Sequence, residues 1–251
     1  MVHAVMNVSL YQAAAALNAS ARWQDIITQN LASGSVPGFK KQDLTFSSVE
    51  AAQGQGGLIP TTQSATNFQQ GQIRPTNVPT DVAIEGDGFF AVQLPSGQTA
   101  YTRDGEFQFN AQGQLVTKQG YLVQTDSGPI QMDPKISGPI SIASDGTVSQ
   151  VFNQSSNQLG KLKITTFNDP HLLTQIGNSY FAANNPNLVA TTATNPTVRQ
   201  GYLEAGNTSS ITEMANLITA MRQFEANQKV VQMNDDRMSR AISELGNPNP
   251  A

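Results

Sequence analysis

Two short acidic segments, Glu85–Asp87 and Asp104–Glu106, are the first places where this sequence could support chemistry. Two carboxylates at a suitable separation act as acid and base in glycosidases, and clustered carboxylates bind calcium. Asp87 and Asp104 each precede a glycine, however, and Asp-Gly is a strong turn sequence because both residues tolerate positive φ. No flanking run supplies the further oxygen ligands of a calcium site. We therefore interpret both segments as turns, with no catalytic, cofactor-binding or metal-ligating residue.

The other reactive side chains form no recognisable site. The histidines are His3 and His171, and nothing marks either as the positioned base of a Ser-His-Asp triad. The chain has no cysteine, which excludes disulfides and thiolate metal sites. We interpret Arg103 as a local turn residue that pairs with a nearby carboxylate, and a bridge between subunits is the alternative. The sequence thus predicts a protein that is not an enzyme and uses no cofactor.

The composition is poor in charge. Charged residues make up 13% of the chain and the formal net charge is −4, whereas about 25% charged residues is typical. A basic stripe for nucleic acid and a polybasic anchor for an anionic membrane are both missing. No stretch approaches the roughly 18 apolar residues of a membrane span, and the start of the sequence does not resemble a secretory signal. We expect no nucleic acid partner, no membrane insertion and, for an exported protein, a route that reads no cleaved signal peptide.

Both ends of the chain carry a heptad pattern. The stronger pattern has a strict three-four spacing near the C-terminus: Met214, Leu217, Met221, Phe224, Gln228, Val231, Asp235, Met238, Ile242 and Leu245. A weaker pattern keeps the same spacing near the N-terminus: Met6, Leu10, Ala13, Leu17, Ser20, Gln24, Ile27 and Leu31. Stripes this narrow are typical of coiled-coil seams, which need a partner helix to cover them. We expect the helices to pair with each other or with other copies of the chain, and the alternative is a helix hairpin that packs on the rest of the protein.

Between these helices the sequence indicates β structure. Short apolar runs, such as Phe89–Val92 and Leu162–Thr165, alternate with Asp-Gly and other turn sequences. We predict an α+β fold in which an all-β central domain, a sandwich or partly open barrel, is flanked by N- and C-terminal helices that pair as a coiled coil. The expected domains are an N-terminal assembly helix at 1–35, an extended or loosely ordered connector at 36–80, a β-rich body at 81–205 and a C-terminal assembly helix at 206–251.

Three groups of segments carry a resemblance to a known family. They are Asn30–Ala32 with Pro37–Lys40, then Asp81–Val92 with Tyr101–Phe107, and finally Gln200–Asn207 with Met221–Lys229. In order, spacing and placement they resemble the N-terminal signature, the β core and the C-terminal signature of the axial proteins of the bacterial flagellum, which build its rod and hook. The β core is most similar to that of the distal rod protein, and the proximal rod protein is the alternative.

The resemblance implies a structural subunit of the flagellar basal-body rod, which polymerises into a helical tube and transmits torque from motor to hook. It also implies contacts with other rod and hook axial proteins, export through the flagellar type III apparatus, a place in the rod where it crosses the periplasm, and termini that fold only on assembly. The expected assembly seam comprises Leu10, Leu17, Ile27, Leu31, Leu217, Met221, Phe224, Val231, Met238 and Ile242. The residues expected to shape the turn after the first helix are Asn30, Gly38 and Phe39.

Two further alternatives remain. A short hook-type axial protein would keep the family and change the position in the flagellum. A secreted oligomeric β-sandwich binding module would belong to another class, and it would require exposed aromatic platforms on its β faces. The single tryptophan, Trp23, lies instead in the expected first helix, off the seam, where either the β body or a neighbouring subunit covers it.

Overall fold

A computed structural model describes residues 2–50, 58–126, 128–132, 138–152, 155–177, 179–194 and 196–246. The chain divides into two compact units. The first, named here the helical unit, comprises residues 1–32, 42–66 and 209–251, and the second, the β body, comprises residues 33–41 and 67–208. None of the helices in the described ranges is both long and apolar enough to cross a membrane.

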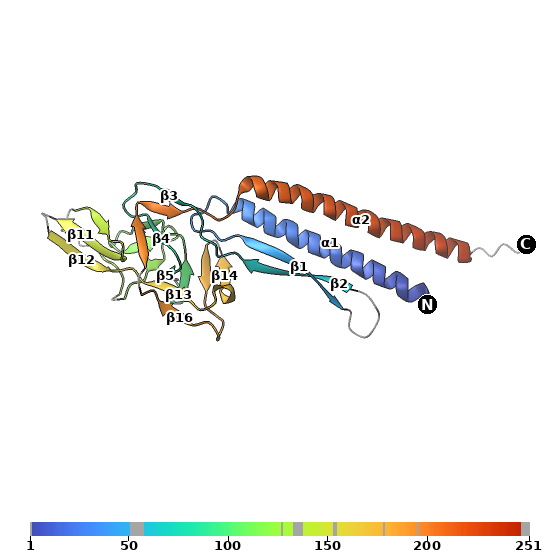
Figure 1. Ribbon diagram of the computed structural model, residues 1–251, viewed down its shortest axis with the longest axis horizontal. Coiled ribbons are helices and arrows are strands. Elements are labelled where there is room, and N and C mark those ends of the chain that lie inside the picture. The colour runs from blue at the N-terminus through green and yellow to red at the C-terminus, as the bar shows by residue number, and fades with distance from the viewer. Residues whose placement is uncertain are drawn as a thin grey trace, which may run out of the picture. The chain divides into compact units, whose positions relative to one another are not determined.

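Two long helices and a β hairpin make up the helical unit. Helix α1 spans Val2–Ala32 and helix α2 spans Ser210–Gly246, and the two lie side by side and run in opposite directions (Figure 1). Strands β1 (Gln42–Glu50) and β2 (Leu58–Thr66) pair antiparallel along their whole length. The segment 36–80, in which we expected an extended or loosely ordered connector, therefore contains two long paired strands.

Helix α1 is long because its sequence contains many helix formers and few breakers. Ala13–Ala16 are strong helix formers, and no glycine or proline precedes Gly34. One side of α1 packs on the hairpin, where the rings of Trp23 and Phe46 meet edge to face with 5.8 Å between their centroids. Trp23 thus packs against a hairpin of its own unit, a partner that the sequence did not indicate.

The β body is built from short strands. They are β3 (Ile73–Pro75), β4 (Val82–Glu85), β5 (Phe89–Gln93), β6 (Thr99–Thr102), β7 (Phe107–Phe109), β8 (Leu115–Thr117), β9 (Leu122–Val123), β10 (Ile140–Ile142), β11 (Thr147–Phe152), β12 (Ser155–Lys161), β13 (Ile164–Phe167), β14 (Thr174–Gly177), β15 (Tyr180–Ala182), β16 (Ala190–Thr192), β17 (Thr197–Gln200) and β18 (Tyr202–Glu204), with a 3-10 helix, η1 (Pro170–Leu172). The apolar runs Phe89–Val92 and Leu162–Thr165 overlap β5 and β13. The protein is mostly β with two helices, in agreement with the predicted α+β class.

One sheet of nine strands forms most of the β body. Its main path runs β14-β15-β6-β5-β9-β8-β7, and β13, which is paired with β16, also joins β5. Smaller antiparallel sheets consist of β10-β11-β12, of β17-β4 and of β18-β3. The β17-β4 and β18-β3 pairs matter most for the site, because they bring the end of the β body next to its beginning.

The β body buries two hydrophobic clusters. The larger one includes Phe90 and Ile164, and the smaller one is formed by Phe89, Leu173 and Phe181. Phe89 and Phe90 are neighbours on β5 and point to opposite faces of the sheet, because side chains alternate along a strand. Strand β5 therefore contributes to both clusters and lies at the centre of the unit.

Candidate assembly surfaces and a buried charge cluster

Helix α2 packs on α1 with one face. Ala220 is fully buried on this face, and Leu217, Phe224, Val231 and Met238 are half-buried. Each of these four half-buried residues follows the previous one by seven positions, so they represent every second position of the predicted C-terminal seam. This half of the seam lies toward α1. The other half does not.

Small and polar groups connect the two helices. The side-chain amide of Gln24 donates to the carbonyl of Ala220 at 3.4 Å, and Nδ2 of Asn227 donates to Oγ of Ser20 at 3.1 Å. Ser20 is buried and its hydroxyl also donates to the carbonyl of Ala16, one turn earlier. Short side chains such as those of Ala220 and Ser20 allow the two backbones to approach closely, so that these hydrogen bonds can form.

The alternate positions of the C-terminal seam face away from α1. The exposed fractions of Met221 and Ile242 are 51% and 64%, although both were expected in the seam. Ala220 and Asn227 occupy the contact with α1 instead, a shift of one residue or about 100° around the helix. The shift has two physical reasons. A methionine at the place of Ala220 would hold the two helices apart, and Asn227 forms a hydrogen bond with Ser20 across the contact.

An exposed apolar row follows the first turns of α2. We name Ile211, Met214, Ile218 and Met221 the outer stripe, and each of them is at least 51% exposed. Their spacing of three and four residues places them on one side of the helix. Exposed apolar side chains gathered on one side of a helix make this face a candidate contact surface.

The predicted seam residues of α1 differ in burial. Ile27 is 2% exposed, whereas Leu17 and Leu31 are half-buried. The side chain of Leu10 lies outside the described residues. From Leu17 onward, these predicted seam residues of α1 are therefore at least partly buried.

The chain leaves α1 through a tightly packed turn. Asn30 is buried, and its side-chain amide donates to the carbonyl and accepts from the N–H of Gln42, each at 2.9 Å. Phe39 is also buried. Gly38 has a φ of 66°, and a Cβ at this residue would lie 2.3 Å from the carbonyl carbon of Arg103. Only glycine fits at this position.

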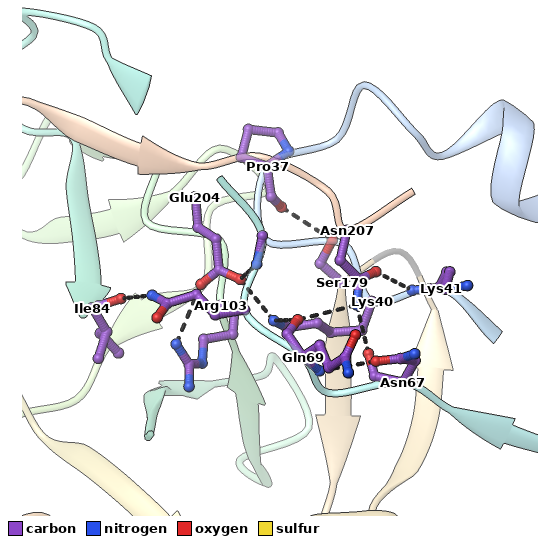
Figure 2. Close-up of polar contacts among 12 residues, drawn as sticks. Pro37, Lys40, Lys41, Asn67, Gln69, Ile84, Arg103, Ser179, Glu204 and Asn207 are labelled. Atoms are coloured by element: carbon purple, nitrogen blue, oxygen red, sulfur yellow. Dashed lines mark hydrogen bonds and ion pairs between the residues drawn. The ribbon is translucent and has the colours of Figure 1, made fainter. Parts of the chain in front are cut away.

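Three charged side chains meet inside the β body (Figure 2). Lys40 Nζ lies 2.6 Å from Glu204 Oε1, and Arg103 Nη1 lies 3.2 Å from Glu204 Oε2. All three side chains are at most 5% exposed. One carboxylate is therefore shared by two cations, and the three residues come from the turn after α1, from the end of β6 and from the end of β18.

Backbone groups complete the surroundings of the Lys40–Glu204 pair. Lys40 Nζ also donates to the carbonyl of Gln69 at 2.8 Å, and the N–H of Gly71 donates to Glu204 Oε1 at 2.8 Å. Burial lowers the pKa of the Lys40 amine below its usual value, while the charge and hydrogen bond of Glu204 act in the opposite direction. Glu204 thus favours the charged form of the lysine, against the effect of burial.

The Arg103 guanidinium is held on several sides. Its Nη2 donates to the carbonyl of Gly86 at 2.7 Å, and its Cζ lies 5.2 Å from the ring centroid of Phe89. Burial lowers the pKa of Arg103, and the negative charges of Glu204 and Asp87 oppose this shift. Its Nε is buried with no hydrogen-bond partner among the described residues. A planar cation with several fixed partners cannot change its orientation without losing them.

The cluster joins two root segments, which we define as residues 33–41, leading from α1, and residues 204–208, leading to α2. Three hydrogen bonds also connect these root segments: from the N–H of Gly38 to the carbonyl of Glu204 at 2.7 Å, from the N–H of Lys41 to Oδ1 of Asn207 at 2.7 Å, and from the N–H of Asn207 to the carbonyl of Phe39 at 3.2 Å. The start and the end of the β body are therefore bonded directly to each other (Figure 2).

Sequence reasoning missed this cluster. Lys40, Arg103 and Glu204 all belong to segments that carried the family resemblance, but only Arg103 received a structural interpretation. That interpretation, a local turn residue, is wrong, because the ion-pair partner of Arg103 is Glu204, 101 positions away. The available signal was a charged residue directly after apolar residues, as in Gly-Phe-Lys and Tyr-Leu-Glu, in a chain with few charges.

The carboxylates of the second acidic segment have structural partners. Asp104 Oδ1 accepts the N–H of Glu106 at 3.0 Å, and Glu106 pairs with Lys118 at 3.0 Å. Burial raises the pKa of Asp104 to about 6. Within the described ranges, no group of three or more histidine or acidic residues could hold a metal ion. The arrangement at Asp104 is that of a turn closed by a carboxylate.

Comparison with known protein families covers α2 and two of the three residues of the charge cluster. Residues 83–150 match the model of the flagellar hook protein FlgE/F/G D1 domain, and residues 199–244 match that of the flagellar basal body rod FlgEFG protein C-terminal. The first match includes Arg103, and the second includes Glu204 and nearly all of α2.

Individual relatives match over nearly the whole chain. The flagellar basal-body rod protein FlgG of Borreliella burgdorferi is 34% identical over 93% of this chain and 97% of its own length. The rod protein FlgF of Caulobacter vibrioides is 33% identical, with 90% and 92% covered, and FlgF of Escherichia coli is 31% identical, with 94% and 97% covered. Proteins of this family are structural subunits and not enzymes. At this identity and coverage, the chain belongs to the flagellar basal-body rod protein family.

Proposed function

We propose that copies of this chain polymerise through their terminal helices into a helical tube, which forms part of the basal-body rod and transmits torque from the motor to the hook. The observation that carries this proposal is the outer stripe of α2. One face of the helix contacts α1, and a second apolar face remains exposed. An exposed apolar row of this kind stabilises an assembly and disfavours an isolated subunit.

The predicted seam residues would then serve two contacts. Leu217, Phe224 and Val231 pair α2 with α1 as a coiled coil within one subunit, and Met221 and Ile242 contact neighbouring subunits. A contact between two different surfaces of identical subunits forms an open helical filament when its rotation does not close a ring. Many repeated contacts of this type would share the torque.

The helix pair would complete its folding only on assembly. Its interface consists of half-buried apolar side chains and of polar groups such as Ser20 and Asn227. Helices without a fully covered apolar face are marginal in water, and their ordering entropy is offset when partners bind. Late folding of the helices suits export of the unfolded chain through the flagellar type III apparatus.

The neighbours in the rod would be further copies of this chain and other rod and hook axial proteins, where the rod crosses the periplasm. The β-core motif Asp81–Val92 favours the distal part of the rod, and the proximal rod or a short hook-type position is the alternative. The binding-module hypothesis has no comparable support, because the single tryptophan, Trp23, packs on Phe46 in the helical unit.

Charge placed in the outer stripe tests the proposal. Met214→Asp combined with Ile218→Asp should abolish the filaments that sedimentation and electron microscopy detect for the purified chain, and should abolish swimming of cells that carry it. Thr219→Asp with Gln223→Asp is the matched control, because it adds the same charge at the same spacing to exposed positions outside the stripe. Filaments formed by the stripe variant, or an equal defect in the control, would refute the assignment of this face.

A further inference from the structure

The buried charge cluster calls for a reason beyond stability. Taking Lys40, Arg103 and Glu204 out of water carries a large desolvation penalty, and well-packed apolar residues in place of a buried ion pair are often as stable or more stable. The chain is otherwise poor in charged residues. Charged side chains form directional hydrogen bonds, which apolar side chains do not. Each of these bonds fixes the position of one particular atom.

We propose that Lys40, Arg103 and Glu204 form a clamp that holds the two root segments in one register in the free subunit, before any neighbour is present. The clamp would fix the point at which the chain enters the β body from α1 and the point at which it leaves for α2. This inference rests on the proposed function, because a fixed origin of both helices matters only for a subunit that assembles through them.

The bonds of Glu204 explain how the clamp fixes the register. Glu204 Oε1 accepts from Lys40 at 2.6 Å and from the N–H of Gly71 at 2.8 Å, and Oε2 contacts Arg103 at 3.2 Å (Figure 2). A shift of residues 204–208 by one position would break all of these bonds, and a shift of residues 33–41 would break the bond from Lys40. Either shift leaves a charge buried without a partner. An alternative register is therefore strongly disfavoured.

Close packing removes the remaining freedom. The backbone of Gly38 lies against the backbone of Arg103, where an added Cβ would be 2.3 Å from the carbonyl carbon. At Gly71 an added Cβ would be 1.9 Å from the carbonyl oxygen of Ala205. Both root segments are thus confined by the backbone of the β body as well as by the ions.

A fixed origin favours assembly for an entropic reason. Because the root segments adjoin the end of α1 and the start of α2, holding them together raises the effective concentration of each helix near the other. Ordering that is completed before binding does not subtract from the binding free energy. The clamp would therefore lower the concentration of subunits at which the polymer forms.

Amide hydrogen exchange of the full-length monomer tests the clamp. Lys40→Met should speed exchange at the N–H groups of Gly38, Lys41 and Asn207 by at least about tenfold, while the amides of Ala91 and Leu115, which donate within the β body, stay protected. Unchanged exchange at the three root amides would overturn the proposal, and so would faster exchange at all five, which indicates general destabilisation.

Two further variants complete the experiment. Lys118→Met removes the exposed pair with Glu106 and should leave the root amides unchanged. Glu204→Gln keeps the size of the side chain and one oxygen for the N–H of Gly71. It should give the same root-specific increase in exchange, and it replaces Lys40→Met as the test if Lys40→Met does not fold. A root-specific effect of Lys118→Met equal to that of Lys40→Met would overturn the clamp.

Assembly separates this inference from the proposed function. Lys40→Met should raise the subunit concentration needed for filaments several-fold, and filaments at the wild-type concentration would contradict the clamp. The outer-stripe variant should lose filaments with normal protection of the root amides. If that variant formed filaments, the proposed assembly surface would fail, whereas the exchange result would still decide whether Lys40 holds the root segments.

Discussion

Lys40 Nζ and Glu204 Oε1 lie 2.6 Å apart in the interior of the β body, although 164 positions separate the two residues in the sequence. The contact joins the segment that follows the first helix to the segment that precedes the last one. Most of the chain is therefore enclosed between two residues that form one ion pair, and folding of the β body brings its two ends together.

Loss of the shared carboxylate of Glu204 should strongly destabilise the fold. Glu204→Ala leaves Lys40 and Arg103 buried without their anion, and we expect a loss of about 3–5 kcal/mol in the free energy of unfolding. Glu106→Ala breaks only the more exposed pair with Lys118 and should lose less than about 1 kcal/mol. Urea denaturation followed by circular dichroism measures both. Similar losses in the two variants would show that the buried ion pairs contribute no more to stability than the exposed pair does.

Gly38 should not tolerate a side chain. Gly38→Ala combines a φ of 66° with a Cβ only 2.3 Å from the backbone of Arg103, so we expect a loss of more than about 2 kcal/mol. Gly97→Ala is the matched control. Gly97 also has positive φ, but nothing lies within 4 Å of the added Cβ, so only about 1 kcal/mol of backbone strain is expected. If thermal denaturation gives equal losses, the close approach at Gly38 is not important.

Asp104 should make stability depend on pH. Burial raises its pKa from 3.8 to about 6, so between these values the folded protein binds more protons than the unfolded chain does. The free energy of unfolding should therefore fall as the pH rises from about 4 to about 6. Asp104→Asn should remove this dependence and stabilise the protein at pH 7 by roughly 1–3 kcal/mol, with little effect near pH 4.

Denaturation curves at several pH values measure this effect, and Asp145→Asn is the control. Asp145 is exposed, and the backbone N–H of Thr147 holds its pKa below the usual value. Its replacement should give no stabilisation at pH 7. A gain for Asp104→Asn that is the same at pH 4 and pH 7 would contradict the origin of the effect in a buried ionisable group.

Charge on the inner face of α2, the face that packs on α1, should affect the helical unit and leave the β body folded. Phe224→Asp with Val231→Asp places two carboxylates against α1 and should prevent filament formation and swimming, while circular dichroism still reports the strands of the β body. Gln223→Asp with Val230→Asp places the same residues at exposed positions with the same spacing, and it should retain the helix pair. Normal swimming of cells that carry the inner-face variant would contradict helix pairing as a step in assembly.

Much of the β body could be predicted, because its strands can be recognised from a few consecutive residues. Runs such as Phe89–Val92 are apolar, short and bounded by Asp-Gly turns, and each of these properties is visible within a few residues. The hairpin of β1 and β2 could not be predicted in the same way. Its strands, Gln42–Glu50 and Leu58–Thr66, are mostly polar, and the partner of Phe46 is Trp23 on a helix.

The heptad pattern located the helices but not their contacts. Leu217, Phe224 and Val231 are half-buried, whereas Met221 and Ile242 are exposed and Ala220 is fully buried next to Met221. A pattern of apolar residues cannot show that a small residue is preferred where two backbones approach closely. The charge cluster was missed for a related reason, since the partners Arg103 and Glu204 are brought together only by the pairing of distant strands.

Ala220 and Met221 are consecutive in the chain, yet Ala220 is fully buried and Met221 is 51% exposed. A larger side chain at Ala220 would push α1 away and alter the subunit by itself, whereas a change at Met221 would leave the subunit intact and alter only how it is received by others. If copies assemble through the outer stripe as proposed, substitutions at every third or fourth residue of this helix can raise or lower the affinity between copies without changing the fold of one copy.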